Sequence, residues 1–164
     1  MNTNAIKKKE KSEAMIRKLD WLPNLDYYLY KTRKRRLIME NRPLFSQIQS
    51  IESGLPFTDF DKIRCALELS QRKMGKIVGI GHSTLAQRKK SGRLSKNESE
   101  RVDRISRIFC RAKEVFEDKD IAKKWLNEPL EYFQGKTPLH FTSTEIGGRE
   151  VEDLLGRIEH GVFS

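Results

Sequence analysis

The sequence has few cysteines and histidines and no long apolar run. Only Cys65, Cys110 and three histidines stand among its 164 residues, with no CxxC pair and no Cys/His cluster. Neither a disulfide framework nor a zinc site is therefore supported. No apolar run approaches the roughly 18 residues that a membrane span requires, and no apolar core follows the lysine-rich start as it would in a signal peptide. We expect a cytosolic protein with reduced, mostly buried thiols, no cofactor and no membrane association.

Positive charge is what the sequence has in excess. Lys and Arg total 33 against 23 Asp and Glu, a net charge of +10, while hydrophobic residues make up 37%. This composition can close a modest core of one domain, or of two small ones, and it suggests a polyanionic partner. The excess is uneven, because residues 61–116 carry +9 (15 basic, six acidic) and residues 117–164 carry −4 (six basic, ten acidic). Such asymmetry is typical of a chain that meets nucleic acid with one part and something else with another, although solvated charge would also fit.

The first 57 residues are expected to form a basic, partly ordered N-terminal arm. They contain two Lys/Arg clusters and an aromatic segment, Trp21–Tyr30, that predicts a short helix. Pro43, Gly54 and Pro56 then indicate a linker and a domain boundary near residue 57. The arm could add phosphate contacts or form an assembly surface, and the sequence does not decide between them.

From Thr58 the helical period is clear. Thr58 with Asp61 suggests the start of one helix. Ser70 suits the N-cap of a second helix that stops at Gly79, and a third is expected over 82–91, ending at Gly92. Two helices joined by a glycine turn predict a helix-turn-helix, with an ordinary helical hairpin as the alternative.

The second helix of this motif is rich in residues that read bases or anchor phosphates. Gln87 can pair with adenine, Ser83 is permissive, and the basic residues can reach guanine or phosphate. The start of the first helix would lie near the DNA backbone. The predicted DNA-binding residues are Gln71, Arg72, His82, Ser83, Gln87, Arg88, Lys89 and Lys90.

A long helix follows, because Ser95 and Glu98 form a capping box before an apolar repeat that reaches Phe116. Four arginines run beside that repeat, and they could clamp phosphates, meet the acidic C-terminal part or be solvated. Of these three interpretations, a solvated stripe is favoured. These arginines are Arg101, Arg104, Arg107 and Arg111.

The remainder predicts further short helices. One is expected over 118–126, a turn at Thr137-Pro138, and a last helix capped by Thr142 with Glu145 and ended by Gly161. Gly147 and Gly148 lie early in that last helix, where they cost stability unless another element approaches closely. The fold class is therefore all-α: a helix-turn-helix bundle over 58–116, including the long helix, and a small helical domain over 117–164.

The C-terminal third carries a family pattern in order, spacing and residue identity. The runs that carry it are Ala122-x-x-Trp125-Leu126-x-x-Pro129, Gly135-Lys136-Thr137-Pro138-Leu139, Thr144-Glu145-x-Gly147 and Val151-x-x-Leu154-Leu155-Gly156-Arg157-Ile158-Glu159-x-Gly161-Val162. With these runs the sequence resembles the C-terminal domain of the Xre/MbcA/ParS-type antitoxins, and the helix-turn-helix is similar to the Xre-like motif of that family. Tyr132-Phe133 and His140-Phe141 depart from the usual residues.

The resemblance implies a bacterial type II antitoxin that silences a toxin encoded beside it and represses its own operon. The usual toxin has a RES domain, which destroys NAD, or is a related ADP-ribosyl-transferring protein. We expect residues 117–164 to bind it, and the tail Arg157–Ser164 to reach into or cover its active site; packing of Val162 and Phe163 on the parent domain is the alternative. The predicted toxin-binding residues are Arg149, Arg157, Glu159, His160, Gly161, Val162, Phe163 and Ser164.

Two other function classes are open to the sequence. A stand-alone transcription regulator would use the C-terminal domain only to dimerise. In either case we expect a homodimer on two operator half-sites about one helical turn apart. An enzyme is not expected, because His82, His140 and His160 show no catalytic spacing.

Overall fold

The computed structural model describes residues 44–161. The basic arm up to residue 43, with its aromatic segment, and the predicted toxin contacts Val162, Phe163 and Ser164 lie outside the described residues. The described part is built of helices without a named strand, so the all-α prediction is confirmed.

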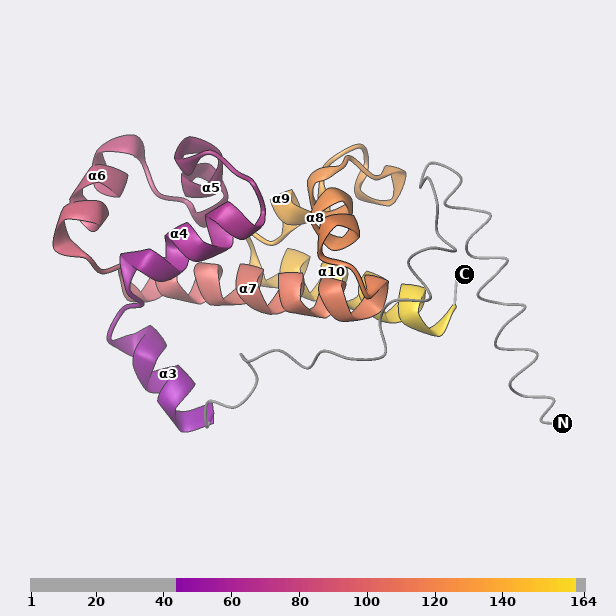
Figure 1. The fold of residues 1–164 in the computed structure, drawn as a ribbon, viewed down its shortest axis with the longest axis horizontal. Helices are drawn as coiled ribbons and strands as arrows, with labels where there is room; N and C mark the ends of the chain where they lie inside the picture. Colours follow the sequence, from indigo (N-terminus) through magenta and orange to yellow (C-terminus); the bar gives the residue numbers. More distant parts are fainter. Residues whose placement is uncertain (1–43, 162–164) are drawn as a thin grey trace, which may run out of the picture.

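The molecule is organised around α7 (Lys96–Phe116), a helix of 21 residues along which most of the other helices lie (Figure 1). The predicted capping box begins it: the Glu98 amide donates to the Ser95 hydroxyl and the Ser95 amide to the Glu98 carboxylate. Because this box satisfies two otherwise unpaired N–H groups, the start of α7 is fixed by local sequence.

The N-terminal half of α7 supports the helix-turn-helix, formed by α4 (Phe57–Ala66), α5 (Gln71–Val78) and α6 (His82–Ser91). As predicted, the Ser70 hydroxyl accepts from the Lys73 amide, and Gly79 ends α5 with φ of 76°. The predicted Thr58 start is wrong: α4 begins at Phe57 with Pro56 as N-cap and no side-chain cap. Pro56 fits there because the fixed φ of proline suits the start of a helix.

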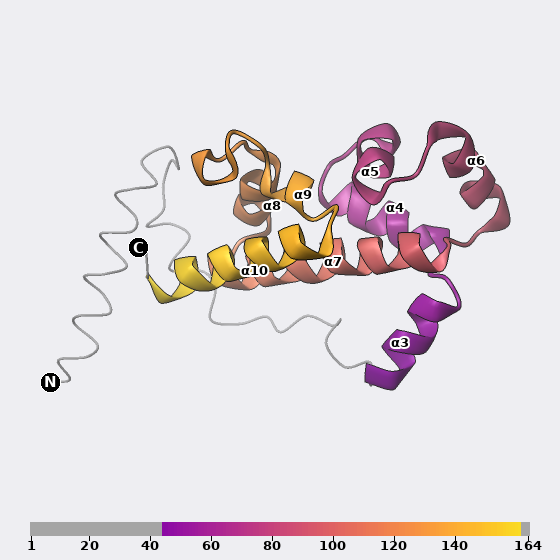
Figure 2. The same ribbon diagram turned by 180° about the vertical axis from the view of Figure 1, so that it is seen from behind.

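The C-terminal half of α7 carries α8 (Lys119–Asn127), the 3₁₀ turn η1 (Glu131–Phe133), α9 (Pro138–Phe141) and α10 (Glu145–His160). Seen from behind, α10 lies beside α7 (Figure 2). The N-cap of α10 is Thr144, which accepts from the Gly147 amide; the prediction of Thr142 is wrong. Thr142 is instead buried, with its hydroxyl donating to the Leu139 carbonyl at 2.7 Å, so it closes the preceding turn.

A helix, α3 (Leu44–Glu52), occupies the stretch where the breakers indicated a linker, and it packs on α7. Gln47 donates to Asp103 of α7 at 2.9 Å. The linker interpretation is wrong because Pro43 and Gly54 bracket this helix and do not interrupt it. The side chains of Phe45 and Ile48 are largely exposed.

One continuous apolar core joins both halves, from Leu55 in the helix-turn-helix unit to Ile158 in α10. Cys110 is partly buried, but Cys65 is exposed, so the expectation of mostly buried thiols is wrong for Cys65. It lies off the face on which α4 buries Phe60 and Ile63. No helix among the described residues is both long and apolar enough to cross a membrane.

Both early glycines of α10 face a close neighbour, as the sequence required. A Cβ at Gly147 would lie 2.2 Å from the Phe141 carbonyl oxygen, and one at Gly148 would lie 2.6 Å from Cδ of Arg104. Gly156, in the same helix, has nothing within 4 Å of a built Cβ. Close packing therefore explains the first two glycines and not the third.

We predict opposite effects for two alanine substitutions in α10. Gly147→Ala should lower the free energy of unfolding by about 1–3 kcal/mol, because backbone must move to admit the methyl group. Gly156→Ala, the matched control, should raise it by about 0.5–1 kcal/mol through helix propensity alone. Urea denaturation followed by circular dichroism measures both, and stabilisation by Gly147→Ala would contradict the close approach.

Candidate functional site

The outward face of α6 presents the predicted base-reading residues. Ser83, Gln87 and Lys90 are exposed and lie, by the 100° step of a helix, opposite Leu85, which is buried against α5. The N-cap of α6 is Gly81, which gives no side-chain cap. Backbone N–H groups in the first turn are therefore without a side-chain acceptor, an arrangement that suits phosphate binding.

The flanking predicted contacts lie at the edges of this face. His82 and Lys89 are exposed on one flank of α6. At the start of α5, Arg72 is exposed and Gln71 is half-buried. The helix-turn-helix thus brings seven of the eight predicted DNA-binding residues to accessible positions without an ion pair to a neighbouring helix: Gln71, Arg72, His82, Ser83, Gln87, Lys89 and Lys90.

Arg88 has a different environment. Its Nε donates to the Glu98 carboxylate at 2.8 Å, and its side chain is only 27% exposed. Glu98 is the residue that closes the capping box of α7. The pair therefore ties the recognition helix to the start of α7, a positioning role that sequence spacing did not indicate.

Arg101 holds the turn between the two motif helices. Its guanidinium donates to the Val78 carbonyl at 2.8 Å, and a Cβ at Gly79 would lie 2.7 Å from its Nη1. Charge at a helix C-terminus and a satisfied end carbonyl both favour this contact. Glycine is suited to residue 79 because it adopts a left-handed φ without strain and leaves space for the Arg101 side chain.

The other three arginines of the α7 stripe meet the acidic helix α10. Arg104 contacts Glu145 at 2.7 Å and also donates to the Thr142 carbonyl, with its side chain only 12% exposed. Farther along, the same two helices are joined by two more pairs, Arg107 with Glu152 at 2.9 Å and Arg111 with Glu159. The pairs advance in the same direction on both helices, so α7 and α10 run parallel. The favoured interpretation of a solvated stripe is therefore wrong for these three arginines, because they pair with glutamates of the acidic part.

These ion pairs shift the pKa of some of the paired side chains in the direction that favours their charged forms. The positive charge of Arg104, with a hydrogen bond from Arg149, lowers the pKa of Glu145. The hydrogen bond to Glu159 raises the pKa of Arg111, and pairing with Glu152 outweighs the burial of Arg107 and raises its pKa. Part of the basic excess of residues 61–116 is thus neutralised within the molecule.

The predicted toxin-binding residues of α10 do not form one cluster. Arg149 is exposed and pairs with Glu145 at 3.3 Å, while Glu159 faces α7. Arg157 turns toward η1, where its Nη2 donates to the Tyr132 hydroxyl at 2.6 Å. His160 is exposed, and Gly161 ends the helix with φ of 63°.

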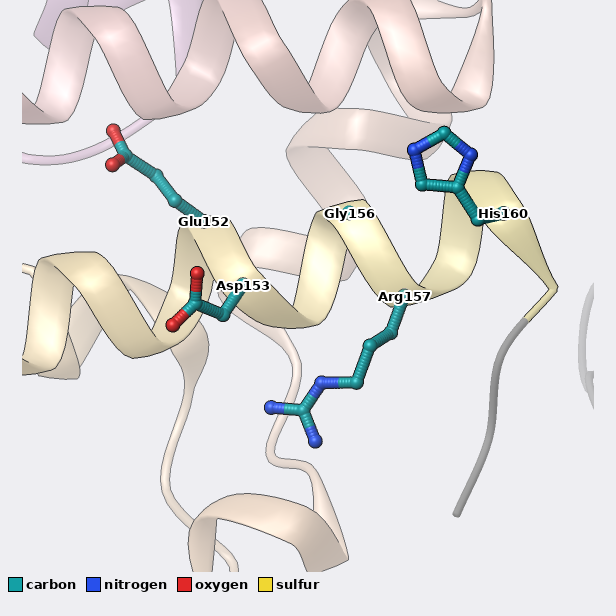
Figure 3. A pocket seen from close by; sticks show the side chains of 5 residues that line it. All are labelled: Glu152, Asp153, Gly156, Arg157 and His160. Carbon is teal, nitrogen blue, oxygen red and sulfur yellow. The ribbon is translucent and has the colours of Figure 1, made fainter.

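A hollow of about 560 Å³ lies over the C-terminal part of α10. Figure 3 shows Glu152 and His160 pointing toward one side of the helix and Arg157 toward the other, with Gly156 between them. Gly156 adds no side chain to this lining. The lining residues are Glu152, Asp153, Gly156, Arg157 and His160.

Comparison with known proteins agrees with this two-part architecture. Residues 46–107 match a family model described as the antitoxin Xre-like helix-turn-helix domain, and residues 111–161 match the antitoxin Xre/MbcA/ParS C-terminal toxin-binding domain. A protein named Antitoxin Xre from Yersinia enterocolitica is 34% identical over 119 residues, which cover 71% of this chain and 80% of the relative. The chain belongs to the Xre family of antitoxins.

Two further members of the Xre family support the assignment. A protein of the same name from Photorhabdus laumondii is 34% identical over 116 residues, covering 70% of this chain and 78% of the relative. Another from Pseudomonas putida is 30% identical over 164 residues, covering 98% of each. All three are named antitoxins, and in the described part of this chain no group of His, Cys, Asp and Glu is arranged to hold a metal ion.

We predict that acid weakens the contact between α7 and α10. A carboxylate with a lowered pKa in the folded state stabilises the fold above the ordinary glutamate pKa of about 4.3, and this contribution is lost as the pH falls through that value to the lowered one. Glu145→Gln should therefore reduce the drop in thermal midpoint between pH 7 and pH 3.5. The exposed Glu100→Gln is the control and should keep the full drop; an equal drop in both variants would contradict the role of Glu145.

Proposed function

We propose that this antitoxin binds and neutralises a RES-type, NAD-degrading toxin encoded beside it, and that its helix-turn-helix binds operator DNA to repress the shared operon. The observation that carries the proposal is the pairing, on one helix, of a helix-turn-helix with a domain that matches the toxin-binding domain of the family. The resemblance to Xre/MbcA/ParS-type antitoxins favours a RES toxin or a related ADP-ribosyl-transferring one. The chain would act by binding and not by catalysis.

The surface of α6 supports the DNA-binding half of the proposal. Gln87 supplies a bidentate donor and acceptor suited to adenine, and Ser83 can accept or donate to either kind of pair. Lys89, Lys90 and Arg72 are exposed cations within reach of phosphates. A homodimer would present two such helices to half-sites about one helical turn apart.

Co-expression with the product of the adjacent gene tests the toxin-binding half. The expected result is a stable complex of the two purified proteins in which NAD consumption by the partner is suppressed. A stand-alone transcription regulator would bind its own promoter DNA but would purify without a partner and leave NAD consumption unchanged, and that result would contradict the proposal.

Two substitutions on α6 should separate base reading from phosphate anchoring. Gln87→Ala should weaken binding to the operator by about 1–3 kcal/mol and relax the preference at one base pair. Lys89→Ala should weaken binding to all sequences and make the salt dependence shallower by about one phosphate contact. Fluorescence anisotropy with operator and random DNA at several salt concentrations measures both. The same loss on both DNAs from both substitutions would contradict these roles.

The tail is proposed to cover the toxin's active site. Deleting residues 161–164 should then restore NAD consumption in the purified complex while the complex itself persists. This deletion removes Val162, Phe163 and Ser164, which lie outside the described residues, so the assay tests their role directly. Full inhibition by the truncated protein would contradict the hypothesis.

A further inference from the structure

Large exposed apolar side chains are scarce on the described surface. Only Phe45, Ile48, Tyr132 and Ile146 fall in this class among residues 44–161. Phe45 and Ile48 belong to α3, outside the residues that match the toxin-binding domain. Within that match, Tyr132 is 48% exposed and Ile146 is 83% exposed. Exposed aromatic and aliphatic side chains of this kind are typical anchors of protein interfaces.

Tyr132 contacts the face of α10 that carries Ile146, although the two residues are 14 positions apart in the sequence. The Tyr132 hydroxyl contacts Glu150, which follows Ile146 by one turn of α10 and so shares its face. The opposite edge of α10, with Glu145, Glu152 and Glu159, is occupied by the arginines of α7. The face with Ile146 is therefore the one that α7 leaves free.

The polar groups around Tyr132 hold it in a fixed position. Its hydroxyl donates to Glu150 and accepts from Arg157 Nη2 at 2.6 Å, while Arg157 also contacts Glu150 at 2.8 Å. The Arg157 guanidinium carbon lies 5.1 Å from the ring centroid, within the range of a cation–π contact. The hydrogen bond to Glu150 raises the pKa of Tyr132.

Such fixation favours binding. A side chain that is already held loses little conformational freedom on association, so more of its contact free energy appears as affinity. Arginine and tyrosine are also the residue types that most often dominate an interface. The opposite charges of Arg157 and Glu150 satisfy each other, which leaves the exposed part of Tyr132 and most of the Ile146 side chain to be covered by a partner.

We propose that Tyr132 and Ile146 are the two anchors by which this chain holds its toxin, with Glu150 and Arg157 positioning the tyrosine. The inference rests on the proposed function, because the occupant is the toxin and the patch lies inside the part of the chain that matches a toxin-binding domain. The partner surface should offer an apolar recess for Ile146 and a flat apolar contact for the Tyr132 ring.

The test measures the affinity of full-length variants for the purified product of the adjacent gene. Ile146→Asp and Tyr132→Ala should each weaken binding by about tenfold to hundredfold, as expected for interface anchors. Ile146 is the second residue of α10, where an acidic side chain is favourable to the helix, so Ile146→Asp should fold normally. Phe45→Asp makes the same kind of change at a side chain that is 73% exposed on α3, and it should leave the affinity unchanged.

Binding to DNA from the chain's own promoter serves as the second readout and should be the same in all four proteins. If the unchanged chain does not bind the adjacent gene product, the proposed function fails and the inference fails with it. If the unchanged chain binds and both patch variants bind equally well, the inference alone is overturned. A change in self-association by Ile146→Asp, with toxin affinity unchanged, would assign the patch to a second copy and would also overturn it.

Discussion

Both halves of the molecule depend on one shared helix. At 1.5 Å per residue, the 21 residues of α7 extend about 31 Å. Its N-terminal turns bury Val102 and Ile105 beneath the helix-turn-helix, and its C-terminal turns bury Phe109 and Ala112 near α8. A single core and a single helix therefore fix the orientation of the recognition helix relative to α10.

The arginines of α7 mostly make contacts within the protein and add little to its accessible surface charge. Arg101 caps the end of α5, and three further arginines pair with glutamates of α10. Within residues 61–116, exposed cations without an ion pair remain on α5 and α6, among them Arg72, Lys89 and Lys90. The net charge counted along the sequence thus overstates the charge that residues 61–116 can offer to DNA. Three glutamates of α10 neutralise part of that charge within the molecule.

Local signals could be predicted and tertiary ones could not. Ser70, Ser95 and Gly161 were identified from sequence because a cap depends on residues within one turn. The Thr144 cap was misplaced by two residues, since Thr142 offers an equally good local pattern and only burial distinguishes them. The Arg88–Glu98 pair joins two different helices, and the patch at Tyr132 joins η1 to α10, so neither follows from a local sequence pattern. The one sequence hint was Ile146, an apolar residue outside the buried stripe of α10.

Because α6 and the proposed anchor patch are separate surfaces on one scaffold, we expect DNA and toxin to be bound at the same time. Native mass spectrometry of the chain with its own promoter DNA and the adjacent gene product tests this most directly. The expected result is a single complex that contains all three components. Displacement of the DNA by the toxin, with only pairwise complexes observed, would contradict it.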